Sequence, residues 1–151
     1  MPIFGAASPS IQDLLHGAGV TTGFSAPSST SLYFARWLIF NPSNSYVTHA
    51  FECDRAKTLI AVHCIVVITT TSGSPATAVP LYVRVNDTTD TQLGTSQAWS
   101  TPGCTYSDTN VNSGAGVALA AGDDYVFKFG TPAWSTNPTA CFVSLIATYR
   151  R

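Results

Sequence analysis

Hydrophobic and polar positions divide the chain into two parts that meet near residue 31. From Leu32 onward, short runs rich in β-branched and aromatic residues are separated by turn signals, at a spacing of roughly ten residues. The runs cover residues 32–40, 46–53, 58–71, 79–86, 91–99, 104–111, 116–124, 125–130 and 141–149. Because no helical periodicity interrupts them, residues 31–151 are predicted to form one all-β domain, an antiparallel β-sandwich of about eight strands.

The runs differ in how their side chains alternate. In residues 79–86, Leu81 and Val83 fall on one face of the predicted strand, while Tyr82 and Arg84 fall on the other. The runs at 58–68 and 141–149 are largely apolar on both faces, which is typical of strands covered on both sides, here by a second sheet and a neighbouring subunit. We expect the last strand to lie in the middle of the fold.

Residues 1–30 are rich in Gly, Ala, Ser and Pro and are predicted to form an extended arm. One short helix is predicted at residues 10–17, where Ser10 and Asp13 make a capping-box-like pattern and Gly17 closes the helix. Such an arm has little core of its own, so it either lies on its own domain or reaches a neighbour. Its candidate contact residues are Ile3, Phe4, Leu14 and Leu15.

Two similar segments, AWSTPGC at residues 98–104 and AWSTNPTAC at residues 133–141, each place a proline before a cysteine and an apolar run. Proline fixes its own φ and cannot donate to a strand ladder, so it belongs at a corner between strands. Each segment is therefore predicted to end one strand, turn at Pro102 or Pro138, and begin the next strand at the cysteine. The tryptophan rings are expected over the end of the sandwich, where two loops of one type can lie side by side.

Composition and charge narrow the classes of partner. Only 10% of residues are charged, and 7 basic against 8 acidic side chains leave a net charge of −1. We expect no nucleic-acid partner, because binding a phosphate backbone takes a basic surplus. We also expect no membrane contact and no export through a secretory signal, because no apolar run has the required length and the N-terminus lacks a signal pattern. A nearly neutral surface favours burial against copies of the chain or a larger assembly.

Metal and catalytic chemistry are not indicated by any motif. His63 and Cys64 are adjacent in a predicted strand and point to opposite faces, and together with His49 and Cys53 they lack metal-ligand spacing, so no metal or other cofactor is expected. No motif gathers a nucleophile and a base, so we expect no enzyme; glycoside hydrolysis is the alternative if folding gathers the acidic residues. Residues 86–88 and 123–124 are instead predicted to form turns.

Exposed aromatic rings and loop amides suit the binding of sugars or proteins. The candidate contacts are Trp99, Trp134, Tyr106 and Asn137. Packing of the aromatic residues in a core or an interface is the alternative.

The last part of the chain, residues 119–151, contains several short sequence motifs. They are a Leu-x-x-Gly-Asp turn at residues 119–123, an aromatic strand at 125–129, a Thr-Pro-x-Trp-x-Thr-Asn-Pro loop at 131–138 and a terminal apolar strand. This region resembles the closing strands of small β-sandwich heads on bacteriophage virion proteins. Those heads belong to fibre tips and capsid decoration proteins, and their jelly rolls resemble the C1q and tumour-necrosis-factor heads.

The resemblance implies a jelly-roll-like sandwich that assembles as a homotrimer in the virion, with the major capsid protein or other virion proteins as partners. Because no shaft-like segment precedes the sandwich, we expect a capsid or tail decoration protein that cements the particle. A tail-fibre tip that binds a receptor or a host surface glycan is the alternative. The four cysteines are expected to be free and buried unless the finished particle leaves the cell and meets oxidant. In that case Cys104 and Cys141 are the candidate disulfide pair, since the two proline corners match.

Overall fold

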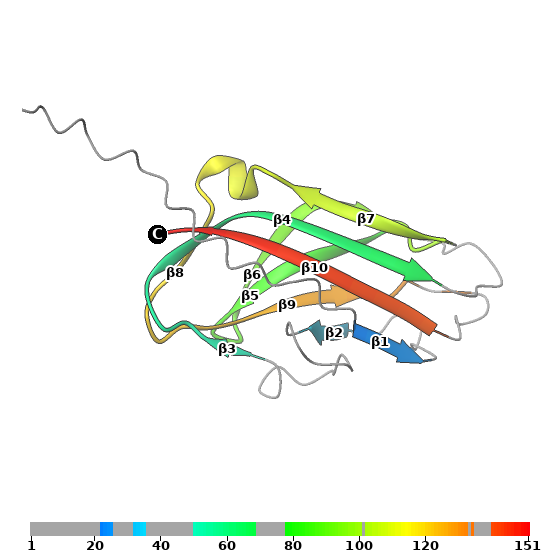
Figure 1. The fold of residues 1–151 in the computed structure, drawn as a ribbon, viewed down its shortest axis with the longest axis horizontal. Helices are drawn as coiled ribbons and strands as arrows, with labels where there is room; N and C mark the ends of the chain where they lie inside the picture. Colours follow the sequence, from blue (N-terminus) through cyan, green and yellow to red (C-terminus); the bar gives the residue numbers. More distant parts are fainter. Residues whose placement is uncertain are drawn as a thin grey trace, which may run out of the picture.

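The computed structural model describes the chain in several segments. The described residues are 22–25, 32–35, 50–68, 78–100, 102–132, 134 and 140–151. Within them, the chain forms ten β-strands and one turn of 3₁₀ helix, η1 (Val111–Gly114) (Figure 1). The strands are β1 (Thr22–Ser25), β2 (Leu32–Ala35), β3 (Phe51–Glu52), β4 (Lys57–Ile68), β5 (Val79–Val85), β6 (Thr89–Gln97), β7 (Gly103–Asp108), β8 (Val117–Leu119), β9 (Asp124–Gly130) and β10 (Ala140–Arg150).

The strands make two antiparallel sheets of five strands each. The first sheet has the order β1-β10-β4-β7, with β8 also paired to β4, and the second has the order β2-β9-β5-β6, with β3 also paired to β9. The pairs are nested along the chain, since β1 pairs with β10, β2 with β9, β4 with β7 and β5 with β6. This nesting, folded so that the pairs divide between two sheets, is the strand order of a jelly roll. The predicted fold class is therefore confirmed.

One hydrophobic core fills the space between the two sheets. The first sheet contributes residues such as Val66 and Val143, and the second contributes Val83 and Phe129, all at most 3% exposed. The predicted alternation in residues 79–86 is confirmed, because Leu81 and Val83 are buried while Tyr82 and Arg84 face outward and are half-buried. Strand β10 lies between β1 and β4, so the prediction that the last strand is central is also confirmed.

The turn predicted at 86–88 is confirmed, whereas the turn predicted at 123–124 lies slightly earlier, at residues 121–122, and Asp124 already begins β9. Residues 86–88 connect β5 to β6, and Asn86 and Asp87 have φ angles of 50° and 53°. Asn and Asp adopt this left-handed conformation more readily than most residues, and the Thr88 N–H donates to the Val85 oxygen at 3.1 Å to close the turn. At the start of β9, the Asn86 side-chain amide donates to the Asp123 carboxylate at 2.8 Å. The two predicted turns thus lie side by side at one end of the second sheet.

Part of the predicted arm lies outside the described residues, including the helix at 10–17 and the contact residues Ile3, Phe4, Leu14 and Leu15. Residues 22–25, which belong to the stretch assigned to the arm, form β1 and pair with β10. Their pairing makes them an edge strand of the first sheet. No helix in the described part of the chain has the length and hydropathy to cross a membrane.

Candidate functional site

The two Trp-Ser-Thr segments meet at one end of the sandwich. Trp99 follows β6 and Trp134 follows β9, and both connections lead from the second sheet to the first. The centroids of the two indole rings are 6.3 Å apart. The Trp134 indole N–H donates to the backbone oxygen of Trp99 at 3.1 Å. The described residues thus confirm that the two connections lie side by side.

Hydrogen bonds within the chain satisfy the polar side-chain atoms of Trp99, Tyr106 and Trp134. The Trp99 indole N–H donates to the Tyr106 hydroxyl at 2.7 Å, and that hydroxyl donates to the backbone oxygen of Val79 at 2.9 Å. The Trp99 ring packs on Phe129 with a centroid distance of 5.4 Å. Burial raises the pKa of the Tyr106 hydroxyl, so this hydroxyl stays protonated and remains a donor.

Trp99, Trp134 and Tyr106 were predicted to contact a partner or a glycan, but all three are buried. Trp99 is 0% exposed, Tyr106 is 1% exposed and Trp134 is 7% exposed. A sugar needs an exposed ring face to stack on, and these rings use their faces in the core. The remaining member of the predicted set, Asn137, lies outside the described residues. The three aromatic rings are buried because large apolar surfaces are more stable when they close the open end of the sandwich than when they face water.

All four cysteines are free thiols in the structure, and the candidate Cys104–Cys141 disulfide is not present in it. Cys104 lies opposite Val66 and Cys141 lies opposite Ile68, on the two sides of β4. Strands separated by a third strand are roughly 9.5 Å apart, whereas a disulfide needs Cα atoms within about 7 Å. The matching corners bring the two connections together, but the strands that follow are kept apart by β4.

Burial also makes these thiols poor nucleophiles. It raises the pKa of Cys104 to about 12 and that of Cys141 to about 12. His63 is exposed while Cys64 is 1% exposed, which confirms that these neighbours point to opposite faces of β4. In the segments that the structure describes, no three His, Cys, Asp or Glu side chains form a group that could hold a metal ion.

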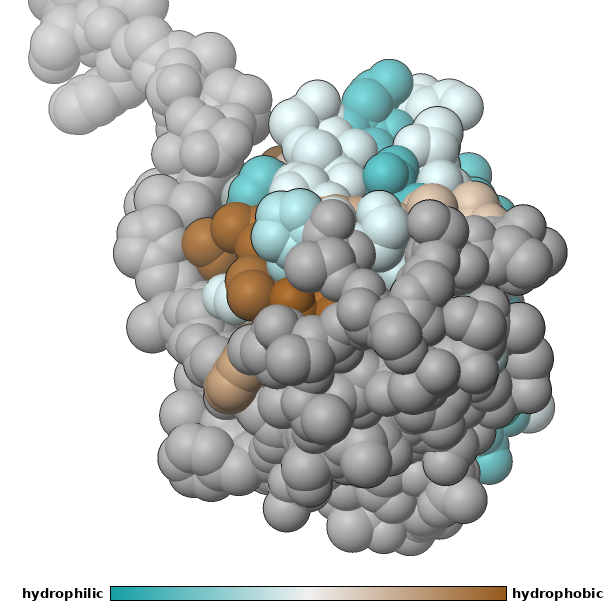
Figure 2. Space-filling view, turned by 90° about the vertical axis from the view of Figure 1, so that its right-hand side faces the viewer, coloured by the Kyte–Doolittle hydropathy of each residue, from teal (hydrophilic) through white to brown (hydrophobic). Residues whose placement is uncertain are grey.

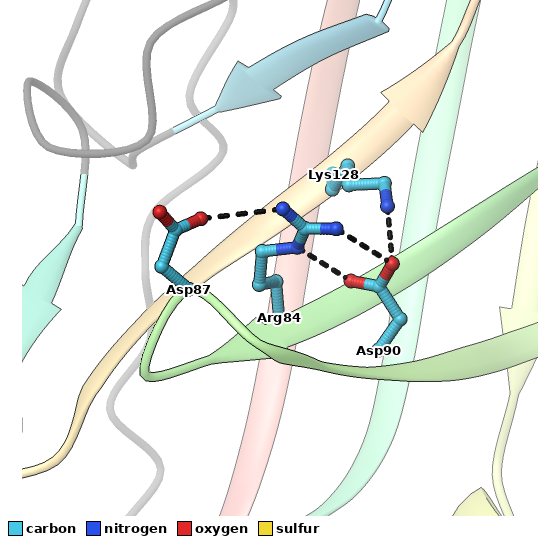
Figure 3. A network of polar contacts seen from close by, with 4 residues as sticks. All are labelled: Arg84, Asp87, Asp90 and Lys128. Carbon is cyan, nitrogen blue, oxygen red and sulfur yellow. Dashed lines mark hydrogen bonds and ion pairs between the residues drawn. The ribbon is translucent and has the colours of Figure 1, made fainter.

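The outer face of the second sheet carries a charged network (Figure 3). Arg84 donates from Nε and Nη2 to both carboxylate oxygens of Asp90, at 2.8 and 3.0 Å, and from Nη1 to Asp87 at 3.2 Å. Lys128 pairs with the same Asp90 carboxylate, and its Nζ lies 5.0 Å from the centroid of the Tyr82 ring. The hydrogen bonds from Arg84, followed by those from Lys128, lower the pKa of Asp90. The network therefore stays ionised and neutralises most of its own charge.

The outer face of the first sheet is different, because large apolar side chains are exposed on it. Ile65 and Val67 of β4 are 40% and 43% exposed, and Ile146 of β10 is 43% exposed. Phe142, on the same face of β10, is half-buried. Figure 2 views the molecule from the right-hand end of Figure 1, and hydrophobic side chains gather at the surface on its left side. We call Ile65, Val67, Phe142 and Ile146 the β4–β10 patch.

The strand register makes this patch continuous. Val67 lies opposite Phe142, and the residue before Ile65 on this face, His63, lies opposite Ile146. Two exposed ionisable side chains adjoin the patch, His63 on β4 and Arg150 at the end of β10. The remaining outward positions of this face, at 61–67 of β4, on β7 and at 142–148 of β10, are small or hydroxylic. They are Ala61, Gly103, Thr105, Ser107, Ser144 and Thr148. None of the outward positions from 61 to 67, 103 to 107 and 142 to 148 is Asp, Glu, Lys or Arg.

Neither surface was singled out residue by residue from the sequence. For the patch a signal was present, since the runs at 58–68 and 141–149 were expected to be covered on both faces. For the charged network, the residues come from β5, β6 and β9, and only the register of those strands reveals that Arg84, Asp90 and Lys128 are neighbours.

No protein-family model matches the chain, and no curated protein sequence or solved structure is significantly similar to it. The function is therefore inferred from the fold, the two sheet faces and the composition of the chain.

Proposed function

We propose that the chain is a structural protein of a bacteriophage virion, a decoration or cement protein of the capsid or tail that acts as a homotrimer. The observation that carries the proposal is the nested strand pairing of a jelly roll, an architecture that viral capsid proteins use. The resemblance of residues 119–151 to the heads of phage virion proteins supports the same function, and these residues include β9 and β10.

The composition supports a protein that works while packed against others. With 10% charged residues and a net charge of −1, the surface has little to keep copies of the chain apart. Cementing would follow from burial of apolar surface between copies and against the major capsid protein or other virion proteins. Contacts of the arm residues Ile3, Phe4, Leu14 and Leu15 with a neighbour would add to this burial.

The alternative of a glycan-binding tail-fibre tip has less support. It relied on the rings of Trp99, Trp134 and Tyr106, and all three rings are buried. We therefore propose the decoration function alone.

The test uses the phage that encodes the chain, grown with the gene intact and with the gene deleted. The intact phage should carry the chain in gradient-purified particles, and the deletion particles should release their DNA at a lower temperature. Purified chain added to deletion particles should restore the release temperature. A variant with Ile3→Asp and Phe4→Asp should fail to bind, whereas the matched control Ser8→Asp should bind normally. Particles that lack the chain, or deletion particles as heat-resistant as intact ones, would rule the proposal out.

A further inference from the structure

We propose that the β4–β10 patch is the surface through which copies of this chain contact one another. This inference rests on the proposed function for the homotrimer and names the surface that builds it. Ile65 and Ile146 lie on the two central strands of the first sheet, where an outward side chain has neighbours on both sides. Both are nevertheless at least 40% exposed. A continuous apolar group of this kind at a protein surface marks an interaction site.

The low charge around the patch favours a second copy as the occupant, with His63 and Arg150 as exposed ionisable neighbours on the described parts of β4 and β10. Among the outward positions of this face at 61–67, 103–107 and 142–148, none carries Asp, Glu, Lys or Arg. A second copy can therefore cover the patch without leaving a charge buried and unpaired, which is the costly outcome at an interface. The net charge of −1 per chain adds little repulsion between copies. A strongly charged partner, by contrast, would find little complementary charge on this face.

The hydroxyl groups around the patch fit the rim of such an interface. Thr105 and Ser107 border it on β7, and Ser144 and Thr148 lie between and beside its members on β10. Uncharged donors and acceptors can pair with polar groups of a neighbouring copy, while the apolar centre excludes water.

The outer face of the second sheet supports the same orientation. Arg84 and Lys128 both pair with Asp90 on that face, so its charges are matched within the chain. The outward β9 residues Val126 and Lys128 are 0% and 7% exposed, so part of this face is already covered within the chain and its charges need no partner from a second copy. In an assembly, the first sheet would therefore turn toward other copies and the second sheet would turn away from them.

The inference is tested with the purified full-length chain, whose monomer mass is 15.9 kDa. Light scattering after size exclusion gives the solution mass over a wide range of protein concentration. The variants are Ile65→Asp, Ile146→Asp and the double variant Ile65→Thr with Ile146→Thr, which keeps β-branched side chains. The matched control is Ser96→Asp, which adds the same charge at an exposed position of β6 in the second sheet. Near-ultraviolet circular dichroism checks that each variant keeps its packing.

We expect the wild type and Ser96→Asp to form the same oligomer. Each Asp variant should raise the concentration at which half of the chains are monomeric by at least about 100-fold, because every contact would then bury an unpaired carboxylate. The double Thr variant should raise it by about tenfold, because it removes exposed apolar surface and leaves the charge unchanged.

Two results would overturn the inference, namely wild-type oligomers that persist in folded Asp variants and a wild type that is monomeric at every concentration. If the Asp variants lose their fold, the double Thr variant decides, and an unchanged dissociation concentration overturns the inference. Particle binding is measured separately and keeps the two proposals distinct. If the patch variants dissociate the oligomer but the chain is absent from virions, the interface is supported and the virion function is rejected. A monomer that binds particles through the patch would reject the interface and leave the virion function standing.

Discussion

Removal of a single hydroxyl at the sandwich end is expected to destabilise the fold strongly. The substitution is Tyr106→Phe, which keeps the ring in place but takes away the oxygen that joins two hydrogen bonds. The Trp99 indole N–H, 2.7 Å from that oxygen, would lose its acceptor in a site where Trp99 is 0% exposed. The backbone oxygen of Val79 would lose a donor at 2.9 Å. Because Trp99 is fully buried, water cannot reach its indole N–H without disturbing the packing.

The magnitude follows from the two polar groups left behind. A buried donor or acceptor that loses its partner costs about 1 to 3 kcal/mol, so two of them cost about 2 to 6 kcal/mol. Because the hydrogen bond to Val79 is only partly buried, we expect a loss of about 3 kcal/mol. For a chain of this length, each kcal/mol lowers the melting temperature by about 2 to 4 °C. The expected decrease at about 3 kcal/mol is therefore roughly 6 to 12 °C.

Urea unfolding followed by tryptophan fluorescence measures the effect, at one fixed protein concentration because an oligomer gains stability by mass action. The control is Tyr82→Phe, whose half-buried ring faces the outside of the second sheet and has no hydroxyl hydrogen bond in the described structure. It should change stability by less than about 0.5 kcal/mol. The double variant with Trp99→Phe should lose less than the sum of the single losses, because both substitutions break one shared bond. A Tyr106→Phe loss no larger than that of the control, or strict additivity, would refute the reasoning.

Three further predictions concern backbone, charge and thiols. Gly103→Ala should cost at least about 2 kcal/mol in urea unfolding, because a Cβ there would lie 1.9 Å from the backbone oxygen of Val66; a stability equal to wild type would contradict this. Asp90→Asn should cost about 1 to 3 kcal/mol at neutral pH. Because the pKa of Asp90 is lowered in the folded state, its contribution to stability is present above about pH 4 and is lost as the pH falls through the folded pKa. The free energies of unfolding of the wild type and the variant should therefore converge in acid. A difference between them that is unchanged down to about pH 2 would be inconsistent with this. Burial raises the pKa of the Cys64 thiol and raises that of Cys104 to about 12, so a thiol reagent at pH 8 should label the native chain slowly and the urea-unfolded chain quickly; equal rates would disprove it.

The fold class could be predicted because it depends on local patterns. Runs of β-branched residues, turn signals at 86–88 and 123–124, and the proline corners each reflect conformational preferences of a few residues. The strand β1 was missed for the same reason, since Thr22–Ser25 lies in a Gly- and Ser-rich stretch. Its strand conformation is supported by pairing with β10, which is a long-range interaction that no local pattern shows.

The candidate site could be predicted only in outline. The sequence correctly indicated that His63 and Cys64 point to opposite faces, since alternation along one strand decides that. It placed Trp99 among the exposed contacts, because a ring at a corner can equally well close the core or face solvent. It paired Cys104 with Cys141, because the intervening position of β4 depends on the sheet order. Which strands are neighbours, and in which register, is set by packing of the whole chain.

The sheet order also explains why the chain contains the Trp-Ser-Thr segment twice. Strands β6 and β9 are both antiparallel to β5, so they run in the same direction and end at the same end of the second sheet. Strands β7 and β10 are both antiparallel to β4, so they also share a direction and begin at one end of the first sheet. The jelly roll thus makes two crossings of the same sense at one end, and similar segments with a proline and a buried tryptophan form both. Topology and the burial of Trp99 and Trp134 thus account for the repeat, and the exposed β4–β10 patch is the surface on which we propose that function be sought.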